Sequence, residues 1–251
     1  MKILFIIFIL ISNNLIALDT DQTEITTDEG IEIFQEEKYY LLKKNVKIKS
    51  KNFTLSADIV KAYFDKDLYD IIKIESLDNV ILSSQNGIIA KGQKIFFSIK
   101  EEKILIEGIK SSLIKKDIQM FSDVSIEINN YTGEFKLRGD NAKLINNDLN
   151  IVGNIINGFF VNNDGINEVN SLYVQDENEI NIKTSKINMY AKESKYSKKN
   201  NLIELFDDVR IIRSNETIIG DYAKINTITE SIKVTSDKTK NKVKILLNND
   251  E

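Results

Sequence analysis

The sequence of 251 residues contains no cysteine, histidine, proline or tryptophan. Without histidine and cysteine, the commonest protein ligands of zinc, copper and haem iron are missing. The same two absences exclude Ser–His and Cys–His nucleophile pairs, because neither an imidazole base nor a thiol is present. No disulfide can form, so backbone hydrogen bonds and apolar burial must hold the fold together. We therefore expect a protein that is not an enzyme and that needs no metal and no cofactor.

A strong excess of positive charge is also absent. The formal net charge is −4, which gives the protein no global field that would attract nucleic acid, so no nucleic-acid partner is expected. Hydrophobic residues make up 42% of the chain and charged residues 29%, a balance that favours a folded protein over wholesale disorder. A single all-β domain often reaches this length, and we expect one domain over residues 18–251.

The N-terminus has the pattern of a secretory signal peptide. Met1 and Lys2 precede the nine apolar residues 3–11, and the small residue Ala17 lies just before an acidic segment. A transmembrane anchor is the alternative, but nine residues rise only about 14 Å as a helix, against a hydrocarbon core of about 30 Å. We expect residues 1–17 to be a cleaved signal peptide and the mature chain to lie outside the inner membrane.

The rest of the sequence predicts strand after strand. Apolar and polar residues alternate with period two in segments such as 46–49, 95–99 and 124–128. Clusters of Asn, Asp and Gly, such as 85–87 and 162–165, separate these segments and suit hairpin turns. The pattern is typical of an antiparallel meander with one buried face.

The predicted strands recur as a two-strand unit. Each unit opens with a valine after a polar residue and continues to a small residue that is usually followed by Asp. The openings are Val46, Val80, Val124 and Val209, and the small residues are Ala57, Gly92, Gly139 and Gly220. The openings are separated by 34, 44 and 85 residues, which indicates a missing unit start within a degraded stretch near 150–180. A repeat of this period predicts stacked units that share one core.

The small residue at Gly139 coincides with a change of strand parity. Phe135 and Leu137 share a face with Gly139, whereas Ala142 and Leu144 have the opposite parity. A bulge or bend at Gly139-Asp140 would place both pairs on one side of the sheet. A loose turn between two short strands is the alternative.

The order of these motifs resembles the OstA-like/LptA family of lipopolysaccharide-transport proteins. The resemblance is carried by the signal peptide, by 25–30 (ITTDEG), 45–48 (NVKI) and 55–60 (LSADIV), and by two C-terminal stretches. These are 205–211 (LFDDVRI) and 219–226 (IGDYAKIN), followed by the ending 242–247 (KVKILL). The match extends over residues 24–247 and is weakest between about 150 and 180.

The resemblance implies a fold, a location and partners. The fold would be an open β-jelly roll, a V-shaped antiparallel trough built from the repeated two-strand units. A periplasmic protein of this kind would shield the acyl chains of lipopolysaccharide (lipid A) during transport to the outer membrane. It would stack head to tail as a homo-oligomer between an inner-membrane LptC-like protein and an outer-membrane LptD-like protein, which are needed for outer-membrane biogenesis.

The inward-facing positions of the predicted strands are the candidate lipid-binding residues. A trough suits lipid because alternate side chains all point to one face, and each buried methylene contributes about 0.8 kcal/mol. The same residues would also suit a closed core, so the trough rests on the resemblance. The candidates are Val46, Ile48, Leu55, Val80, Ile95, Phe97, Val124, Ile126, Ile128, Leu137, Ala142, Leu144, Val209, Ile211, Ala223 and Ile225.

Three other interpretations stay open. An LptC-like protein of the same fold would keep the N-terminal segment as an inner-membrane anchor. A structural β-repeat surface protein would have a closed core and bind no lipid. A polysaccharide-cleaving enzyme on a β-solenoid would need converging acidic and basic residues, and carboxylate clusters such as Asp207-Asp208 are better explained as turns. Unpaired terminal strands at 24–33 and 231–247 would in any case be able to template another chain.

Overall fold

The computed structural model describes residues 23–66, 70–85, 87–163, 166–236 and 242–247, and every regular element in them is an antiparallel β-strand. The predicted all-β class is therefore confirmed. Among these residues no helix is long and apolar enough to cross a membrane. The predicted signal peptide, residues 1–17, lies outside the described residues.

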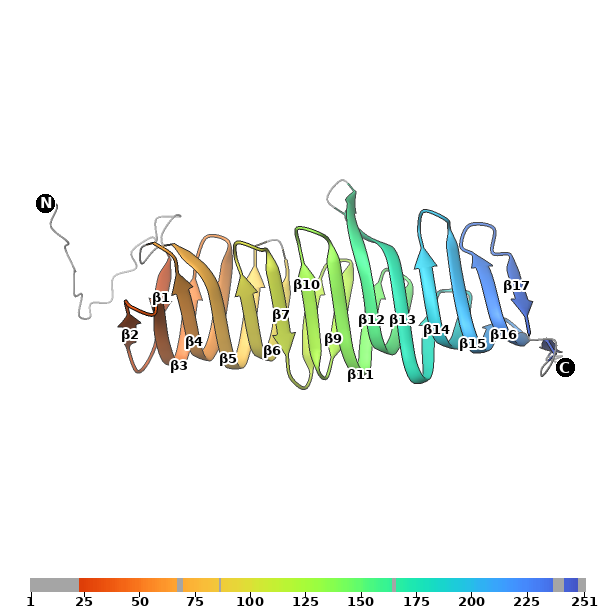
Figure 1. Cartoon of the computed structure of the whole chain (residues 1–251), viewed down its shortest axis with the longest axis horizontal. Helices are drawn as coiled ribbons and strands as arrows, with labels where there is room; N and C mark the ends of the chain where they lie inside the picture. Colours follow the sequence, from red (N-terminus) through yellow and green to blue (C-terminus); the bar gives the residue numbers. More distant parts are fainter. Residues whose placement is uncertain (1–22, 67–69, 86, 164–165, 237–241, 248–251) are drawn as a thin grey trace, which may run out of the picture.

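Eighteen strands follow one another along the long axis of the molecule, with β1 and β2 at one end and β17 at the other (Figure 1). The strands are β1 (Glu24–Thr26), β2 (Ile31–Phe34), β3 (Tyr39–Lys49), β4 (Phe53–Phe64), β5 (Ile71–Ser84), β6 (Ile89–Ser98), β7 (Lys103–Glu107), β8 (Ser111–Lys115), β9 (Ile118–Ser122), β10 (Ser125–Asn129), β11 (Glu134–Asn146), β12 (Leu149–Asn163), β13 (Ile166–Lys183), β14 (Asn188–Ser197), β15 (Leu202–Arg213), β16 (Glu216–Asn226), β17 (Ile232–Thr235) and β18 (Lys244–Leu247).

Most long strands change register once, near the middle. The pairing of β3 with β4, for example, breaks between Lys43 and Val46, and that of β15 with β16 breaks between Phe206 and Val209. Where two short strands replace one long one, the two halves are separate elements: β6 pairs with β7 through one end and with β8 through the other. Each strand, or pair of short strands, is thus divided into two halves at the same level, and the halves form two layers.

We call the line of register breaks the crease. It consists of residues 44–45, 58, 78–79, 93, 108–110, 123–124, 139–141, 154, 176–179, 192, 207–208 and 221. The first layer contains β2, β7, β10, β17 and residues 39–43, 59–64, 71–77, 94–98, 134–138, 155–163, 166–175, 193–197, 202–206 and 222–226. The second layer contains β1, β8, β9, β18 and residues 46–49, 53–57, 80–84, 89–92, 142–146, 149–153, 180–183, 188–191, 209–213 and 216–220.

Small residues lie beside the crease because the two layers come closest there. Gly92, Gly153 and Gly220 are second-layer residues directly next to the crease. A Cβ on Gly92 would lie 2.6 Å from Ile106 of the first layer, and a Cβ on Gly220 would lie 2.4 Å from Val234. Such contacts are far inside van der Waals distance, so side chains at these positions must be small. Each is paired across strands with a small or β-branched residue, as in Val80–Gly92 and Val209–Gly220.

Left-handed backbone conformations form the bends on strands that run from the first layer to the second. Paired residues with positive φ occur at Asp78 (59°) and Asn79 (52°), and likewise at 44–45 and 207–208. Asn and Asp tolerate this conformation better than other residues with a side chain. The Asn79 amide also donates a 2.7 Å hydrogen bond to the Asp58 carboxylate on the neighbouring strand. The Asn45 amide donates to the Asp28 carboxylate, and the Asn141 amide donates to the Asp123 carboxylate. These hydrogen bonds join neighbouring chain segments at the level of the crease.

Cross-strand apolar rows cover the facing sides of the two layers. The crease-side row of the first layer is Leu42, Val60, Ser76, Ile95, Ile106, Ile126, Leu137, Ile156, Val174, Ser194, Leu205, Ala223 and Val234. Its outer neighbour, the mouth-side row, is Tyr40, Ala62, Ile74, Phe97, Ile104, Ile128, Phe135, Gly158, Leu172, Tyr196, Ile203, Ile225 and Ile232. The second-layer row is Ile25, Ile48, Leu55, Leu82, Ala90, Leu113, Met120, Leu144, Ile151, Ile182, Met189, Ile211, Ile218 and Ile245.

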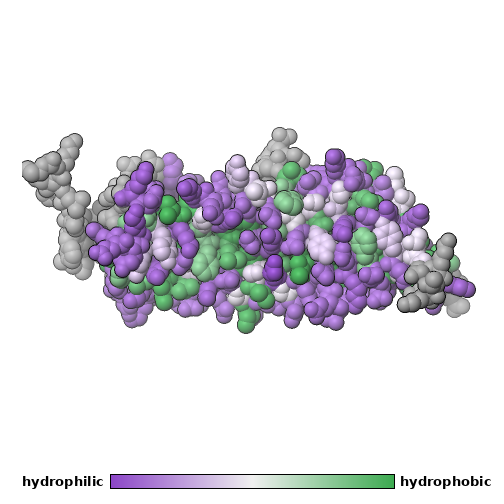
Figure 2. All heavy atoms as spheres, in the orientation of Figure 1, coloured by the Kyte–Doolittle hydropathy of each residue, from purple (hydrophilic) through white to green (hydrophobic). Residues whose placement is uncertain are grey.

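The rows give the molecule one core that extends along its whole length. The buried apolar cluster begins at Leu42 and ends at Ile225. Polar side chains cover most of the surface in view, and apolar side chains show between them (Figure 2). The second-layer row is not covered at its ends, where Ile25 is 41% exposed and Ile245 is 58% exposed.

The predicted bend at Gly139-Asp140 is confirmed. Register shifts between Arg138 and Ala142, and Gly139 has a φ of 134°, a value that only glycine adopts readily. The predicted inward position of Val124 is wrong: its side chain is 55% exposed. Residues 123–124 lie at the crease, between the end of β9 and the start of β10. The inward–outward alternation of side chains that places Ile126 in the core therefore begins with β10 and does not include Val124.

The repeat is also more regular than the sequence spacing indicates. The second-layer residues that follow the crease are Val46, Val80, Ser111, Ala142, Ile180 and Val209, at separations of 34, 31, 31, 38 and 29 residues. Val124 lies in the crease just before β10, a first-layer strand, so the third predicted unit is out of phase by one strand. The stretch near 150–180 contains the long strands β12 and β13, which rise above their neighbours in Figure 1.

The crease predicts a specific effect of substitution at Asn79. Replacing Asn79 with Val places a β-branched side chain at positive φ and removes the bond to Asp58. We expect Asn79→Val to lower the free energy of unfolding by about 1–3 kcal/mol, measured by urea denaturation. Asn79→Gly loses the same bond but adopts positive φ freely, so it should cost clearly less. Equal losses in the two variants would contradict the role given to the backbone.

Candidate apolar groove

The candidate site is the space between the two layers on the side away from the crease. There the mouth-side row of the first layer faces the second-layer row, and hairpin turns of both layers form the rim. Two cavities open along this edge, of about 360 Å³ and about 290 Å³. Both volumes are near the lower end of the range for small-molecule sites. We call the space that contains both cavities the groove.

The larger cavity, here the C-terminal cavity, has an apolar floor from both layers. Leu172 and Ile203 come from the mouth-side row, and Ile182 and Met189 come from the second-layer row. All four side chains are buried, because they pack against the opposite layer. The remaining lining residues are Asp148, Leu149, Ile151, Val174, Thr184, Ser185, Lys186, Ile187, Ser194, Tyr196, Ile225, Asn226, Thr227 and Glu230.

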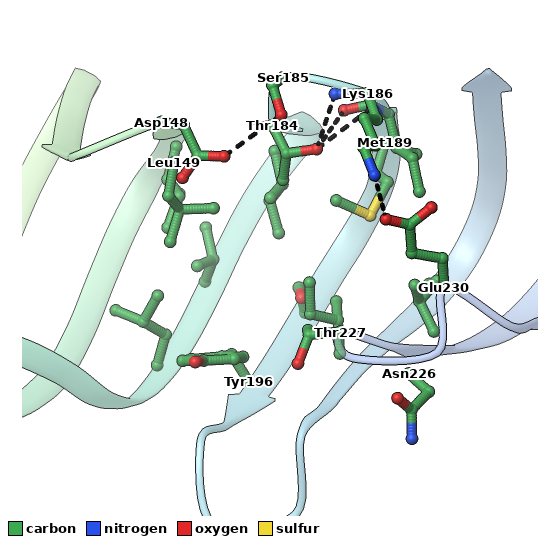
Figure 3. A pocket seen from close by; sticks show the side chains of 18 residues that line it. Asp148, Leu149, Thr184, Ser185, Lys186, Met189, Tyr196, Asn226, Thr227 and Glu230 are labelled. Carbon is green, nitrogen blue, oxygen red and sulfur yellow. Dashed lines mark hydrogen bonds and ion pairs between the residues drawn. The ribbon is translucent and has the colours of Figure 1, made fainter. Parts of the chain in front are cut away.

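Polar and charged side chains gather at the mouth of the C-terminal cavity (Figure 3). Lys186 lies in the β13–β14 turn of the second layer, and Glu230 lies in the β16–β17 turn of the first. Their ammonium and carboxylate groups form an ion pair that links the two layers across the mouth. The Thr184 hydroxyl accepts backbone hydrogen bonds from Lys186 and Ile187, at 3.3 and 3.2 Å, which fixes the turn that carries the lysine.

The pKa values of two side chains at this cavity, Glu230 and Tyr196, are shifted by their surroundings. The hydrogen bond and charge of Lys186 lower the pKa of the Glu230 carboxyl, and Arg213 adds a smaller effect in the same direction. Burial raises the pKa of the Tyr196 hydroxyl, so this tyrosine stays neutral well above neutral pH. The mouth therefore contains one ion pair and the further carboxylate of Asp148, while the Tyr196 hydroxyl stays neutral.

The smaller cavity, here the N-terminal cavity, is lined mostly by apolar residues. These are Phe53, Leu82, Ile88, Phe97, Ile104, Leu113, Ile118, Met120, Ile128 and Phe160. Asn52, Ser84, Lys115 and Asn130 are its polar lining residues, and Lys115 is the only charged one. Its mouth thus differs from that of the C-terminal cavity, where two carboxylates accompany the lysine.

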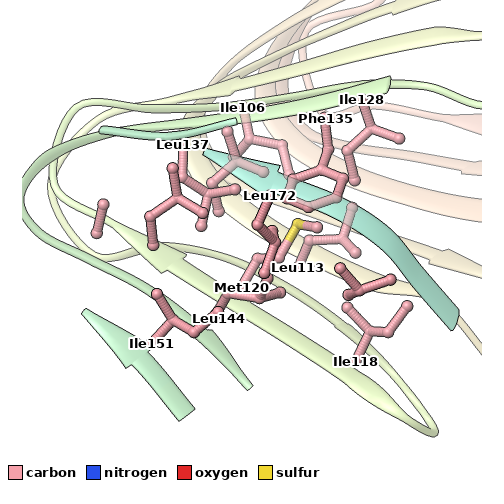
Figure 4. Packing of buried hydrophobic residues seen from close by; sticks show 14 of the residues in the cluster. Ile106, Leu113, Ile118, Met120, Ile128, Phe135, Leu137, Leu144, Ile151 and Leu172 are labelled. Carbon is pink, nitrogen blue, oxygen red and sulfur yellow. The ribbon is translucent and has the colours of Figure 1, made fainter. Parts of the chain in front are cut away.

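Side chains of both layers pack closely in the middle of the core, where Phe135, Leu144 and Leu172 lie together (Figure 4). The Phe135 and Phe160 rings stack with centroids 4.3 Å apart. Gly158 leaves the room that Phe135 and Leu172 fill, since a Cβ there would lie 2.5 Å from the Phe135 ring. Leu144 of the second-layer row is fully buried at the same level. The groove is therefore two compartments with one rim, not a uniform channel.

Fifteen of the sixteen predicted residues lie on the facing sides of the two layers, and Val124 does not. Val46, Val80, Ala142 and Val209 are next to the crease, and Ile48, Leu55, Leu144 and Ile211 are in the second-layer row. Ile95, Ile126, Leu137 and Ala223 are in the crease-side row, and Phe97, Ile128 and Ile225 are in the mouth-side row. Of these, Phe97 and Ile128 line the N-terminal cavity of the groove, and Ile225 lines the C-terminal cavity. Lipid binding by the set stays a prediction.

The local sequence patterns do not single out the charged residues of the rim. Lys186 and Glu230 are 44 residues apart and meet only because the crease brings two turns of different layers face to face. In the sequence, Lys115 is one of several lysines that could meet lipid phosphates but match ordinary exposed lysines, although its parity with Leu113 gives a signal once β8 is known. In the part of the chain that the structure describes, no three acidic residues gather as a metal site would require.

Comparison with known proteins gives structural likenesses but no match in sequence. No family model matches the sequence, and no curated protein matches it. Among solved structures, the chain is similar to LptH, the LptA homologous periplasmic component of the lipopolysaccharide transport device from Pseudomonas aeruginosa. The match has 8% identity and a TM-score of 0.25, and covers 91% of this chain and 96% of that one. Because the identity and the TM-score are this low, the function must be argued from this chain's own residues.

The ion pair at the mouth predicts a shifted titration. The pKa of Glu230 lies below its ordinary value, so as pH falls the ion pair is lost at a lower pH than that at which an unpaired glutamate is protonated. In Lys186→Ala the hydrogen bond and the charge are gone, and the pKa of Glu230 should rise toward the ordinary value. A carbon-detected NMR titration of the Glu230 carboxyl measures both values. Lys183→Ala, on the exposed side of β13, is the control, and an equal shift in both variants would contradict the pairing.

Proposed function

We propose that this chain is an exported, non-catalytic carrier that shields the acyl chains of lipopolysaccharide in its groove between the inner and outer membranes. The observation that carries the proposal is the pair of apolar cavities, which open along one edge between two layers of inward-facing aliphatic and aromatic residues. A closed protein core is close-packed and would not contain cavities of this size beneath an exposed rim.

The lining suits a cargo that binds by surface area. Aliphatic contact is non-directional, so an acyl chain gains burial at any position along a row without needing a fixed partner. The chain lacks histidine and cysteine altogether, so it has no Ser–His or Cys–His nucleophile pair. Surface, not chemistry, is the working part of such a protein. The motif order described above supports lipopolysaccharide as the cargo.

The uncovered ends of the molecule support the proposed partners. Ile25 of β1 and Ile245 of β18 end the second-layer row at opposite ends of the molecule, and both side chains are exposed. Among the described strands, β1 pairs only with β3, and β18 pairs only with β16. Such edges can continue the sheet into another chain. We propose that a head-to-tail homo-oligomer, an LptC-like inner-membrane protein or an LptD-like outer-membrane protein completes them in the periplasm.

Two other functions fit parts of the same observations. An LptC-like component would keep residues 1–17 as an anchor, so N-terminal sequencing of the exported protein separates it from a released carrier. A structural β-repeat surface protein would bind no lipid in the cavities. The cavities favour the carrier, because a purely structural stack would be more stable with this space filled.

Site-specific photo-crosslinking tests the carrier function directly. Benzoylphenylalanine at Phe97 lies in the N-terminal cavity, and at Tyr196 it lies in the C-terminal cavity. Both positions should give lipopolysaccharide adducts on irradiation in cells, since the benzophenone extends an aromatic side chain that already lines the cavity. Adducts are scored by an immunoblot for lipopolysaccharide on the purified protein.

Neighbouring aromatic residues that point outward are the matched controls. Phe96 adjoins Phe97 on the opposite face of β6, where it pairs with Glu75 and Leu105. Tyr173 lies on the outer face of β13, 5.9 Å from the Lys195 ammonium. Both should give background only. Adducts of equal strength on the two faces, or none at Phe97 and Tyr196, would refute the carrier function.

A further inference from the structure

Lys115 occupies an unusual position for a lysine. It is the last residue of β8, with the same parity as Ser111 and Leu113, both of which are buried on the inner face of the second layer. Its cross-strand partner is Ile118, which is also buried. The side chain therefore lies on the inner side of the rim, and it lines the N-terminal cavity.

The mouth of the N-terminal cavity differs in charge from that of the C-terminal cavity. Among the residues that the structure describes, no carboxylate forms an ion pair with it, and no carboxylate lines the N-terminal cavity. The other polar groups at this mouth are the Asn52 and Asn130 amides and the Ser84 hydroxyl, all of which can donate hydrogen bonds. In the C-terminal cavity, by contrast, Lys186 is already paired with Glu230, and Asp148 lies nearby.

We propose that the N-terminal cavity is a binding site for an anionic amphiphile, with the anionic headgroup at Lys115 and the apolar chain against Phe97, Ile104 and Met120. This inference rests on the proposed function and names the headgroup chemistry of one compartment. A phosphate or carboxylate group at the mouth gains a charge-assisted hydrogen bond from the ammonium. The apolar chain gains burial in a cavity that is otherwise lined by ten apolar residues.

The two cavities should then differ in their affinity for anionic headgroups. An anion at the C-terminal mouth would face Glu230 and Asp148, and it would have to displace Glu230 from Lys186. The N-terminal mouth imposes no such competition. Anionic amphiphiles should therefore enter at the N-terminal cavity, while the C-terminal mouth disfavours an anionic headgroup.

Titration calorimetry with three dodecyl amphiphiles below their critical micelle concentrations tests this site. Dodecyl phosphate and dodecanoate carry the two anionic headgroups, and dodecyl maltoside carries none. Lys115→Met removes the charge but keeps an unbranched side chain of similar length. We expect it to weaken binding of the preferred anionic amphiphile on the order of tenfold and to leave dodecyl maltoside unchanged. The difference in affinity between dodecyl phosphate and dodecanoate shows which anionic headgroup the site prefers.

Lys116→Met is the matched control, because Lys116 is exposed, adjacent and outside the cavity lining. It removes the same unit of charge and should change none of the three affinities, whereas Lys115→Arg should keep the anionic preference. Equal effects of Lys115→Met and Lys116→Met would overturn the headgroup site while leaving the apolar groove in place. Failure of the unaltered protein to bind any of the three amphiphiles would overturn the proposed function as well.

Discussion

The bend that each long strand makes at the crease is the constraint on which the rest of the molecule depends. A strand that continued straight would place its second half in the same layer as its first, and no facing layer would exist. Paired residues at positive φ, as at Asp78 and Asn79, turn the chain from the first layer to the second. Small residues such as Gly92 and Gly220 let the layers meet without collision. Because the bends lie at one level, the cross-strand pairs line up as continuous apolar rows.

The space between the layers is a consequence of the same bends. Near the crease, small and β-branched side chains fill the narrow gap, as Val80 and Gly92 do. Away from it the layers diverge, and larger residues such as Phe97 and Tyr196 reach across without closing the gap completely. Charge at the rim then distinguishes the two compartments, since Lys186 is paired with Glu230 and Lys115 lies among amides and a hydroxyl. The path of the backbone thus determines the space available for apolar chains. A few charged residues at the rim determine which headgroups that space can accept.

The sequence predicts the strands, their facing sides and the bend at Gly139 well, because period-two alternation and glycine conformation are local properties. It fails at Val124, where two crease residues interrupt the strand and the alternation restarts. The regular repeat was hidden for a similar reason: Ser111 and Ala142 replace the valine that marks other units, since the position requires only a side chain that fits beside the crease. The Lys186–Glu230 pair depends on contact between distant turns, which no local pattern contains.

Thiol accessibility measures most directly whether the interior is a groove or a sealed core. The protein has no cysteine, so one introduced cysteine is the sole reactive thiol. Ile104 and Ile106 are both buried on β7, but Ile104 lines the N-terminal cavity and Ile106 lies deeper, in the crease-side row. In the folded protein, Ile104→Cys should react with a small maleimide without unfolding, while Ile106→Cys should react only as fast as the protein unfolds. Equal rates at the two positions would contradict the groove.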